Sequence, residues 1–102
     1  MKYFSLWETD MSRISSDPKE MAESMTKAIE MSKQWLKNHP GAEWGAFIGE
    51  HRGYVMADLS ATELMEANLM FSPYIHFKNF QAVTINEYED AFKSTMAKMQ
   101  KK

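Results

Sequence analysis

The sequence predicts an α+β domain of the ferredoxin-like class, with the element order β-α-β-β-α-β and a further helix at the C-terminus. Short runs of aromatic and β-branched residues, typical of strands, alternate with longer runs whose apolar residues recur every three or four positions. Right-handed crossovers would place both main helices on one face of a four-stranded antiparallel sheet, with the first and third strands at its centre. The 102 residues suit one core, so we expect residues 1–102 to form a single domain.

The first half of the chain predicts one strand and one long helix. Residues 2–8 are short and aromatic-rich, which favours a strand. Asp17 can cap the following helix, Pro18 suits its first position, and Glu20 can complete a capping box. The residues Asn-His-Pro-Gly at 38–41 end it, so the helix would be about 30 Å long.

A hairpin and a second capped helix follow. We expect strands at residues 43–49 and 54–59, separated by a turn that ends at Gly53. Ser60 and Glu63 have the spacing of a capping box at the start of the next helix.

The last part of the chain predicts a strand and a terminal helix. Ser-Pro at 72–73 breaks the second main helix, and residues 80–85 are expected to form the fourth strand. Asn86 and Glu89 would form a third capping box. The apolar stripe of the terminal helix consists of Tyr88, Phe92, Met96 and Met99.

Composition restricts the classes of function. A net charge of -2 argues against a general nucleic-acid-binding protein, because such proteins usually present a basic face. The chain has no cysteine, which excludes disulfides and thiolate chemistry. No apolar run approaches membrane-spanning length, so we expect a cytoplasmic protein without a membrane partner. The ten methionines mostly follow helical spacing and are interpreted as core filler rather than as a binding surface.

One face of the predicted sheet lacks a cover. Strand side chains alternate between two faces. The core face is assigned Phe4, Leu6, Val55, Ala57, Val83 and Ile85. The opposite face is assigned Tyr3, Ser5, Trp7, Tyr54, Met56, Asp58, Phe80, Ala82 and Thr84. Because this second face is mainly aromatic and apolar, we expect a second copy to cover it, sheet against sheet, in a homodimer. The alternative is a monomer whose C-terminal helix folds over that face.

The second half of the chain resembles the small DUF3303-type proteins. The shared pattern is a third strand from Gly53 to Asp58, a capped helix, Ser-Pro-Tyr-Ile-His-Phe at 72–77, a fourth strand and an acidic helix start at Glu87 to Glu89. Such proteins resemble the dimeric α+β barrel superfamily. The resemblance implies a ferredoxin-like protomer that pairs through its sheet, and it carries no established activity.

Two residues are the candidates for chemistry. His76 lies among apolar neighbours, where a histidine can act as a general base or a metal ligand, although such histidines are more often half-buried, hydrogen-bonded side chains. Asp58 would have a raised pKa if a partner buried it, or would bond a tyrosine hydroxyl. The three histidines lack metal-ligand spacing, so we expect no metal and no cofactor.

The leading hypothesis is a homodimeric barrel with a pocket for a small apolar or aromatic ligand on the sheet face. Its predicted lining is Tyr3, Trp7, Tyr54, Met56, Asp58 and His76. One alternative is a cofactorless monooxygenase or isomerase that uses His76 or Asp58 as its base. A second alternative is a regulatory or adaptor module. The sequence names no substrate, no pathway and no order of assembly beyond the dimer.

Overall fold

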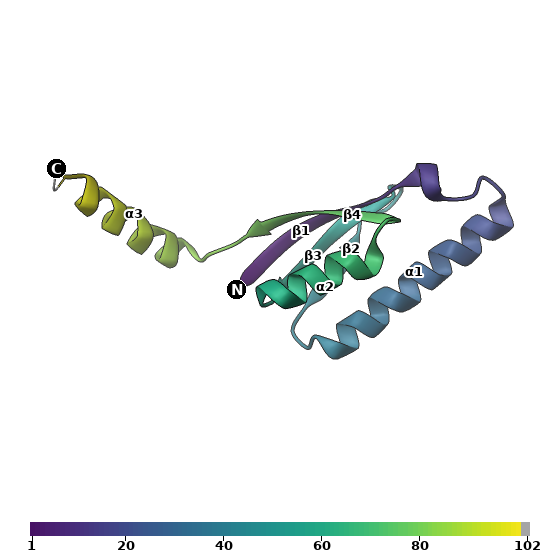
Figure 1. Cartoon of the computed structure of the whole chain (residues 1–102), viewed down its shortest axis with the longest axis horizontal. Coiled ribbons are helices and arrows are strands. Elements are labelled where there is room, and N and C mark those ends of the chain that lie inside the picture. Colours follow the sequence, from purple (N-terminus) through teal and green to yellow (C-terminus); the bar gives the residue numbers. More distant parts are fainter. Residues whose placement is uncertain (101–102) are drawn as a thin grey trace.

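The computed structural model describes residues 1–100 and has an α+β architecture with a four-stranded antiparallel sheet (Figure 1). Its elements are β1 (Lys2–Thr9), the 3₁₀ helix η1 (Met11–Arg13), α1 (Pro18–Asn38), β2 (Glu43–Ala46), β3 (Arg52–Asp58), α2 (Ala61–Phe71), β4 (Ile75–Gln81) and α3 (Ile85–Gln100). The predicted class is therefore compatible with the structure. The order differs from the prediction by the short helix η1 between β1 and α1.

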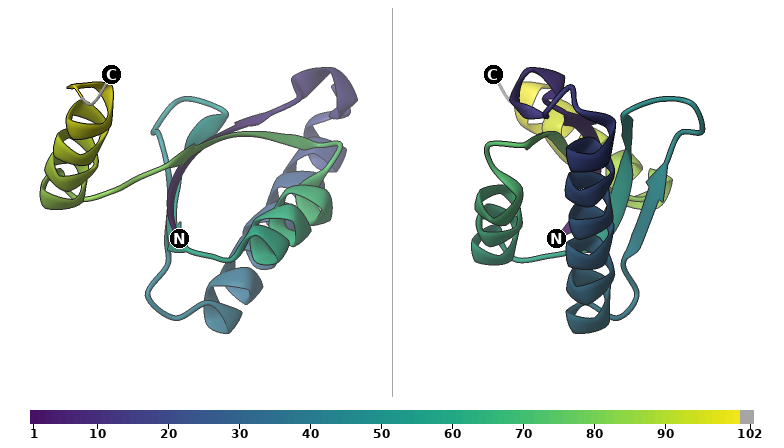
Figure 2. Two further views of the ribbon diagram at one scale, coloured as in Figure 1. Left: turned by 60° about the vertical axis from the view of Figure 1, so that its left-hand side comes forward. Right: turned by 90° about the vertical axis from the view of Figure 1, so that its right-hand side faces the viewer.

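The strands lie in the order β2-β3-β1-β4, so β1 and β3 are the central pair, as predicted. Every neighbouring pair is antiparallel. Helices α1 and α2 lie on the same side of the sheet, and Figure 2 shows the other side uncovered.

The core lies between the sheet and these two helices. Its buried members are Trp35, Val55, Ala57, Leu59 and Ala67. Trp44 of β2 extends this core with aromatic contacts to Trp35, Phe71 and Phe77, at ring-centroid distances of 5.7, 5.0 and 6.0 Å. Large rings from α1, α2, β2 and β4 therefore hold the two layers together.

The predicted faces of the first strand were wrong. In the observed register Tyr3 lies opposite Ala57, and Ser5 lies opposite Val55. Directly opposed residues of an antiparallel pair share a face, so Tyr3, Ser5 and Trp7 lie on the helix side with Val55 and Ala57. Phe4 and Leu6 consequently lie on the uncovered side, although they had been assigned to the core.

The predicted fourth strand was also displaced. It runs from Ile75 to Gln81 instead of 80–85, because the chain re-enters the sheet directly after the Ser72-Pro73 turn, with Ile75 opposite Thr9. Val83 and Ile85 therefore lie outside the sheet and are 50% and 78% exposed.

The capping interactions agree with the prediction at one helix of three. The Ser60 and Glu63 box at α2 is present. Asp17 precedes α1 and Pro18 begins it, but the Asp17 side chain makes no capping hydrogen bond. At α3 the cap is Thr84 rather than Asn86, because Thr84 Oγ1 accepts the Glu87 backbone N–H at 3.1 Å.

Helix α3 projects from the rest of the molecule (Figures 1 and 2). Within residues 1–100 it contacts no other helix or strand. The radius of gyration of 17.8 Å exceeds the about 13 Å expected for a compact chain of this length. The predicted alternative of a monomer with this helix folded over the sheet is therefore wrong for this structure.

Candidate functional site

The uncovered side of the sheet carries a central apolar patch, which we call the open face. It consists of Phe4, Leu6, Tyr54, Met56 and Phe80. The rings of Phe4 and Tyr54 stack with centroids 6.4 Å apart. Leu6, Met56 and Phe80 are 37%, 42% and 44% exposed, so a large part of their apolar surface is in contact with solvent.

The six residues predicted to line a ligand site are divided between the two sides of the sheet. Tyr3 and Trp7 pack beneath the helices, against the core. The Trp7 ring lies over Gly53, where an added Cβ would come within 2.6 Å of it, and Trp7 Nε1–H donates to the Gly45 carbonyl at 3.0 Å. Tyr54, Met56, Asp58 and His76 lie on the other side.

His76 lies on the surface next to η1. Its Nε2 is 3.2 Å from Asp10 Oδ2, and its side chain is 64% exposed. Hydrogen bonds from the Ser12 hydroxyl and from His76 lower the pKa of Asp10 to about 2. This exposed pair joins β4 to the loop after β1, so its geometry indicates a structural contact at the surface.

Asp58 lies at the opposite end of the sheet. Its side chain is 80% exposed and accepts from the Met1 ammonium at 2.9 Å, and this bond lowers the pKa of Asp58 instead of raising it. Asp58 lies opposite Lys2 on β1, whereas His76 lies opposite Glu8. Six residue steps along β1 separate the two positions by about 20 Å. Asp58 and His76 therefore do not act on one small substrate together.

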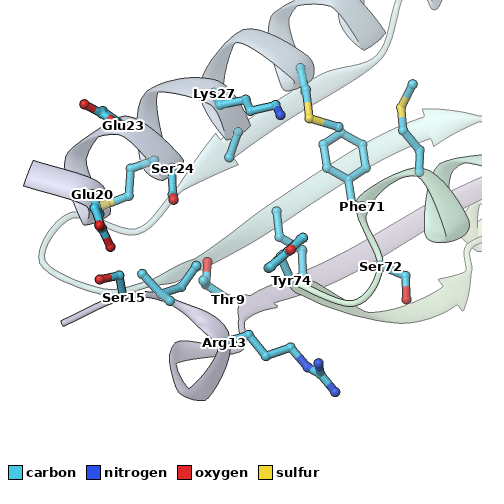
Figure 3. A pocket seen from close by; sticks show the side chains of 16 residues that line it. Thr9, Arg13, Ser15, Glu20, Glu23, Ser24, Lys27, Phe71, Ser72 and Tyr74 are labelled. Atoms are coloured by element: carbon cyan, nitrogen blue, oxygen red, sulfur yellow. The ribbon is translucent and has the colours of Figure 1, made fainter. Parts of the chain in front are cut away.

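The structure places a cavity on the helix side, between the N-terminal half of α1, η1 and the end of α2, which we call the α1/α2 cleft. Its volume is about 710 Å³, within the range usual for small-molecule sites. Figure 3 shows α1 residues such as Ser24 and Lys27 along one side, with Phe71, Ser72 and Tyr74 on the other. The apolar lining includes Ile14, Met25, Met31, Met70, Phe71 and Ile75.

The positive and negative charges of the cleft lining are equal in number. Arg13 and Lys27 oppose Glu20 and Glu23 in its lining. The Arg13 guanidinium is 3.5 Å from Asp10. The four charged side chains of the cleft lining therefore carry no net charge.

A chain of polar side chains, of which only Ser5 is buried, lies beside the core. The Ser5 hydroxyl donates to Asn79 Oδ1 at 2.6 Å, and Asn79 Nδ2 donates to Asn68 Oδ1 at 3.1 Å. Asn68 Nδ2 donates to the Leu64 carbonyl at 2.6 Å. These bonds connect β1, β4 and α2 and satisfy Ser5, which is 5% exposed.

The length of α1 is a feature of the sequence that points to the α1/α2 cleft, but the methionines of this helix were interpreted as core filler. Helix α1 has 21 residues and is about 31 Å long, whereas a strand of seven residues spans about 23 Å. The sheet therefore cannot cover all of α1. Met25 and Ile29, on its apolar side, remain 44% and 55% exposed.

Residues 1–100 contain no cluster of three or more potential metal ligands from His, Asp and Glu. None of the helices in the same range is both long and apolar enough to span a membrane.

Searches against protein-family models, curated proteins and solved structures found no match. The resemblance to DUF3303-type proteins therefore stays a prediction.

Proposed function

We propose that this protein is a binding module for a small, uncharged, mainly apolar molecule and that two copies pair through their open faces as a homodimeric unit. The observation that carries the ligand proposal is the α1/α2 cleft, with its volume of about 710 Å³ and its methionine-rich wall. Thioether side chains are flexible and polarisable, so such a wall adapts to ligands of different shape.

The balanced charge of the cleft lining supports an uncharged ligand. The two basic and two acidic side chains of the lining give no preference for an anion or a cation. Ser24 and Ser72 supply hydroxyl groups in the same lining for a single polar group on the ligand. This proposal replaces the expected sheet-face pocket, whose six residues lie on two sides of the sheet.

The open face supports the homodimer. Its apolar residues lie together at the centre of the sheet, on the side that none of the helices within residues 1–100 covers. A copy of the same face, related by a two-fold axis, is self-complementary in its apolar character. A ligand in the α1/α2 cleft and a partner on the open face occupy opposite sides of the sheet, so they do not compete.

Binding of the neutral fluorescent dye Nile red tests the ligand proposal. Met70→Lys places a charge in the cleft wall, and we expect it to weaken Nile red binding about tenfold, the effect of about 1.4 kcal/mol of lost apolar contact. Met65→Lys is the matched control, since Met65 also lies on exposed α2 surface but is not part of the cleft. Equal affinity of the two variants would contradict the proposed site.

A further inference from the structure

Helix α3 carries an apolar stripe that packs against no other helix or strand within residues 1–100. Its members Ile85, Tyr88, Phe92, Met96 and Met99 are 78%, 61%, 56%, 37% and 61% exposed. At about 100° per residue they fall within roughly 80° of the helix circumference. A 16-residue helix is marginal in water when nothing packs against it. We therefore expect another apolar surface to pack against this stripe.

The stripe is symmetric about its middle residue. Its spacings of 3, 4, 4 and 3 read the same in both directions from Phe92. An antiparallel pair of α3 helices would place Phe92 against its own copy, Tyr88 against Met96 and Ile85 against Met99. Methionine sulfur makes favourable contacts with aromatic rings, so Tyr88 of each chain gains a suitable partner in Met96 of the other.

The charges of α3 favour the same direction of pairing. Glu87, Glu89 and Asp90 lie in its first half, whereas Lys93 and Lys98 lie in its second half. In an antiparallel pair, Glu89 of each chain lies on the same flank as Lys93 of the other and about 3 Å from it along the axis. A parallel pair would place Glu89 of one chain and Lys93 of the other on opposite flanks, so this contact forms only in the antiparallel pair.

We propose that α3 is an interface for a second copy of this chain, paired antiparallel through the stripe centred on Phe92. This interface is separate from the open face. A chain that pairs with a different copy through each of the two interfaces belongs to a closed assembly of at least four chains. The pairing of α3 does not depend on the open face and holds if only one of the two interfaces exists.

Cross-linking tests the pairing, because the natural chain contains no cysteine. Ile85→Cys and Met99→Cys would be made as separate proteins, mixed and oxidised. We expect the mixture to form a disulfide-linked dimer, because an antiparallel pair brings residue 85 of one chain to residue 99 of the other. Each variant alone should cross-link poorly, since like positions then lie about 21 Å apart.

Two further samples make the outcome decisive. Adding Phe92→Glu to both cysteine variants should abolish the cross-link without unfolding the domain, because α3 contacts no other helix or strand within residues 1–100. Adding Met56→Glu, on the open face, should leave the cross-link intact and so separates failure of α3 pairing from failure of sheet pairing. Efficient cross-linking of either cysteine variant alone, or a mixture that cross-links no better than its components, would overturn the proposal.

Discussion

The surroundings of His76 in the structure change the interpretation of this residue, because its hydrogen-bond partner is Asp10. His76 is the best catalytic candidate in the sequence because apolar residues flank it. In the strand, its neighbours Ile75 and Phe77 point to the other side of the sheet, and the exposed His76 side chain forms a hydrogen bond with Asp10. Alternation along a strand therefore removed the apolar environment that would have perturbed its chemistry.

Acid stability tests the role of Asp10. Its pKa is lowered from 3.8 to about 2, chiefly by the Ser12 hydroxyl and then by His76. The folded state holds this carboxylate ionised more readily than the unfolded state, so its contribution to stability is complete above pH 4 and is lost as the pH falls toward 2. We expect Asp10→Asn to lower the urea midpoint at pH 6, with a difference from the wild type that narrows from pH 4 to pH 2. A difference that stays constant over that range would contradict this role.

Single residues also explain why the faces of β1 could not be assigned from its own sequence. Both sets of side chains on this strand are large: Tyr3 and Trp7 on one side, Phe4 and Leu6 on the other. With apolar residues on both sides, the alternation does not show which side of β1 faces the helices. The register against Val55 decides it, and that register is a long-range property of the fold.

At the scale of elements, local signals located helix starts best where the cap is a complete box. Ser60 Oγ accepts the Glu63 N–H at 3.1 Å, and Glu63 Oε1 accepts the Ser60 N–H at 3.1 Å. At α3 two overlapping sequences, Thr84 with Glu87 and Asn86 with Glu89, both had a plausible spacing. The structure uses the first, so residue spacing alone could not select the boundary.

The α2 cap is a quantitative test at this scale. Ser60→Ala removes the acceptor for the Glu63 N–H, and we expect the free energy of unfolding to fall by about 1 kcal/mol, measured by urea denaturation. Ser60→Asp keeps an acceptor at the cap and should restore most of the loss. No difference between the alanine and aspartate variants would show that the box contributes nothing to stability.

At the scale of the whole molecule, the sequence indicated an uncovered apolar face, and the structure retains such a face with a different membership. Tyr54, Met56 and Phe80 remain in it, whereas Phe4 and Leu6 replace Tyr3 and Trp7. The length of α1 indicated that part of this helix extends past the sheet, but the α1/α2 cleft itself could not be placed from the sequence, because it also depends on the position of η1.

Assembly mass tests both proposed interfaces together. By light scattering we expect four chains for the wild type and two chains for either Met56→Glu or Phe92→Glu. The double variant should be a monomer of 11.9 kDa. Met65→Glu, on exposed α2, is the control and should leave the mass unchanged. A wild-type monomer at micromolar concentration would refute both interfaces, and a dimer that only one of the two substitutions dissociates would identify the interface that exists.

The aromatic cluster has a practical consequence for such experiments. All three tryptophans of the chain belong to it, since Trp44 lies 6.4 Å from Trp7 and 5.7 Å from Trp35 between ring centroids. Intrinsic tryptophan emission therefore comes from one place, the layer between the sheet and its two helices. That emission reports melting of the core and does not register events at α3, for which circular dichroism or an attached fluorophore is the appropriate signal.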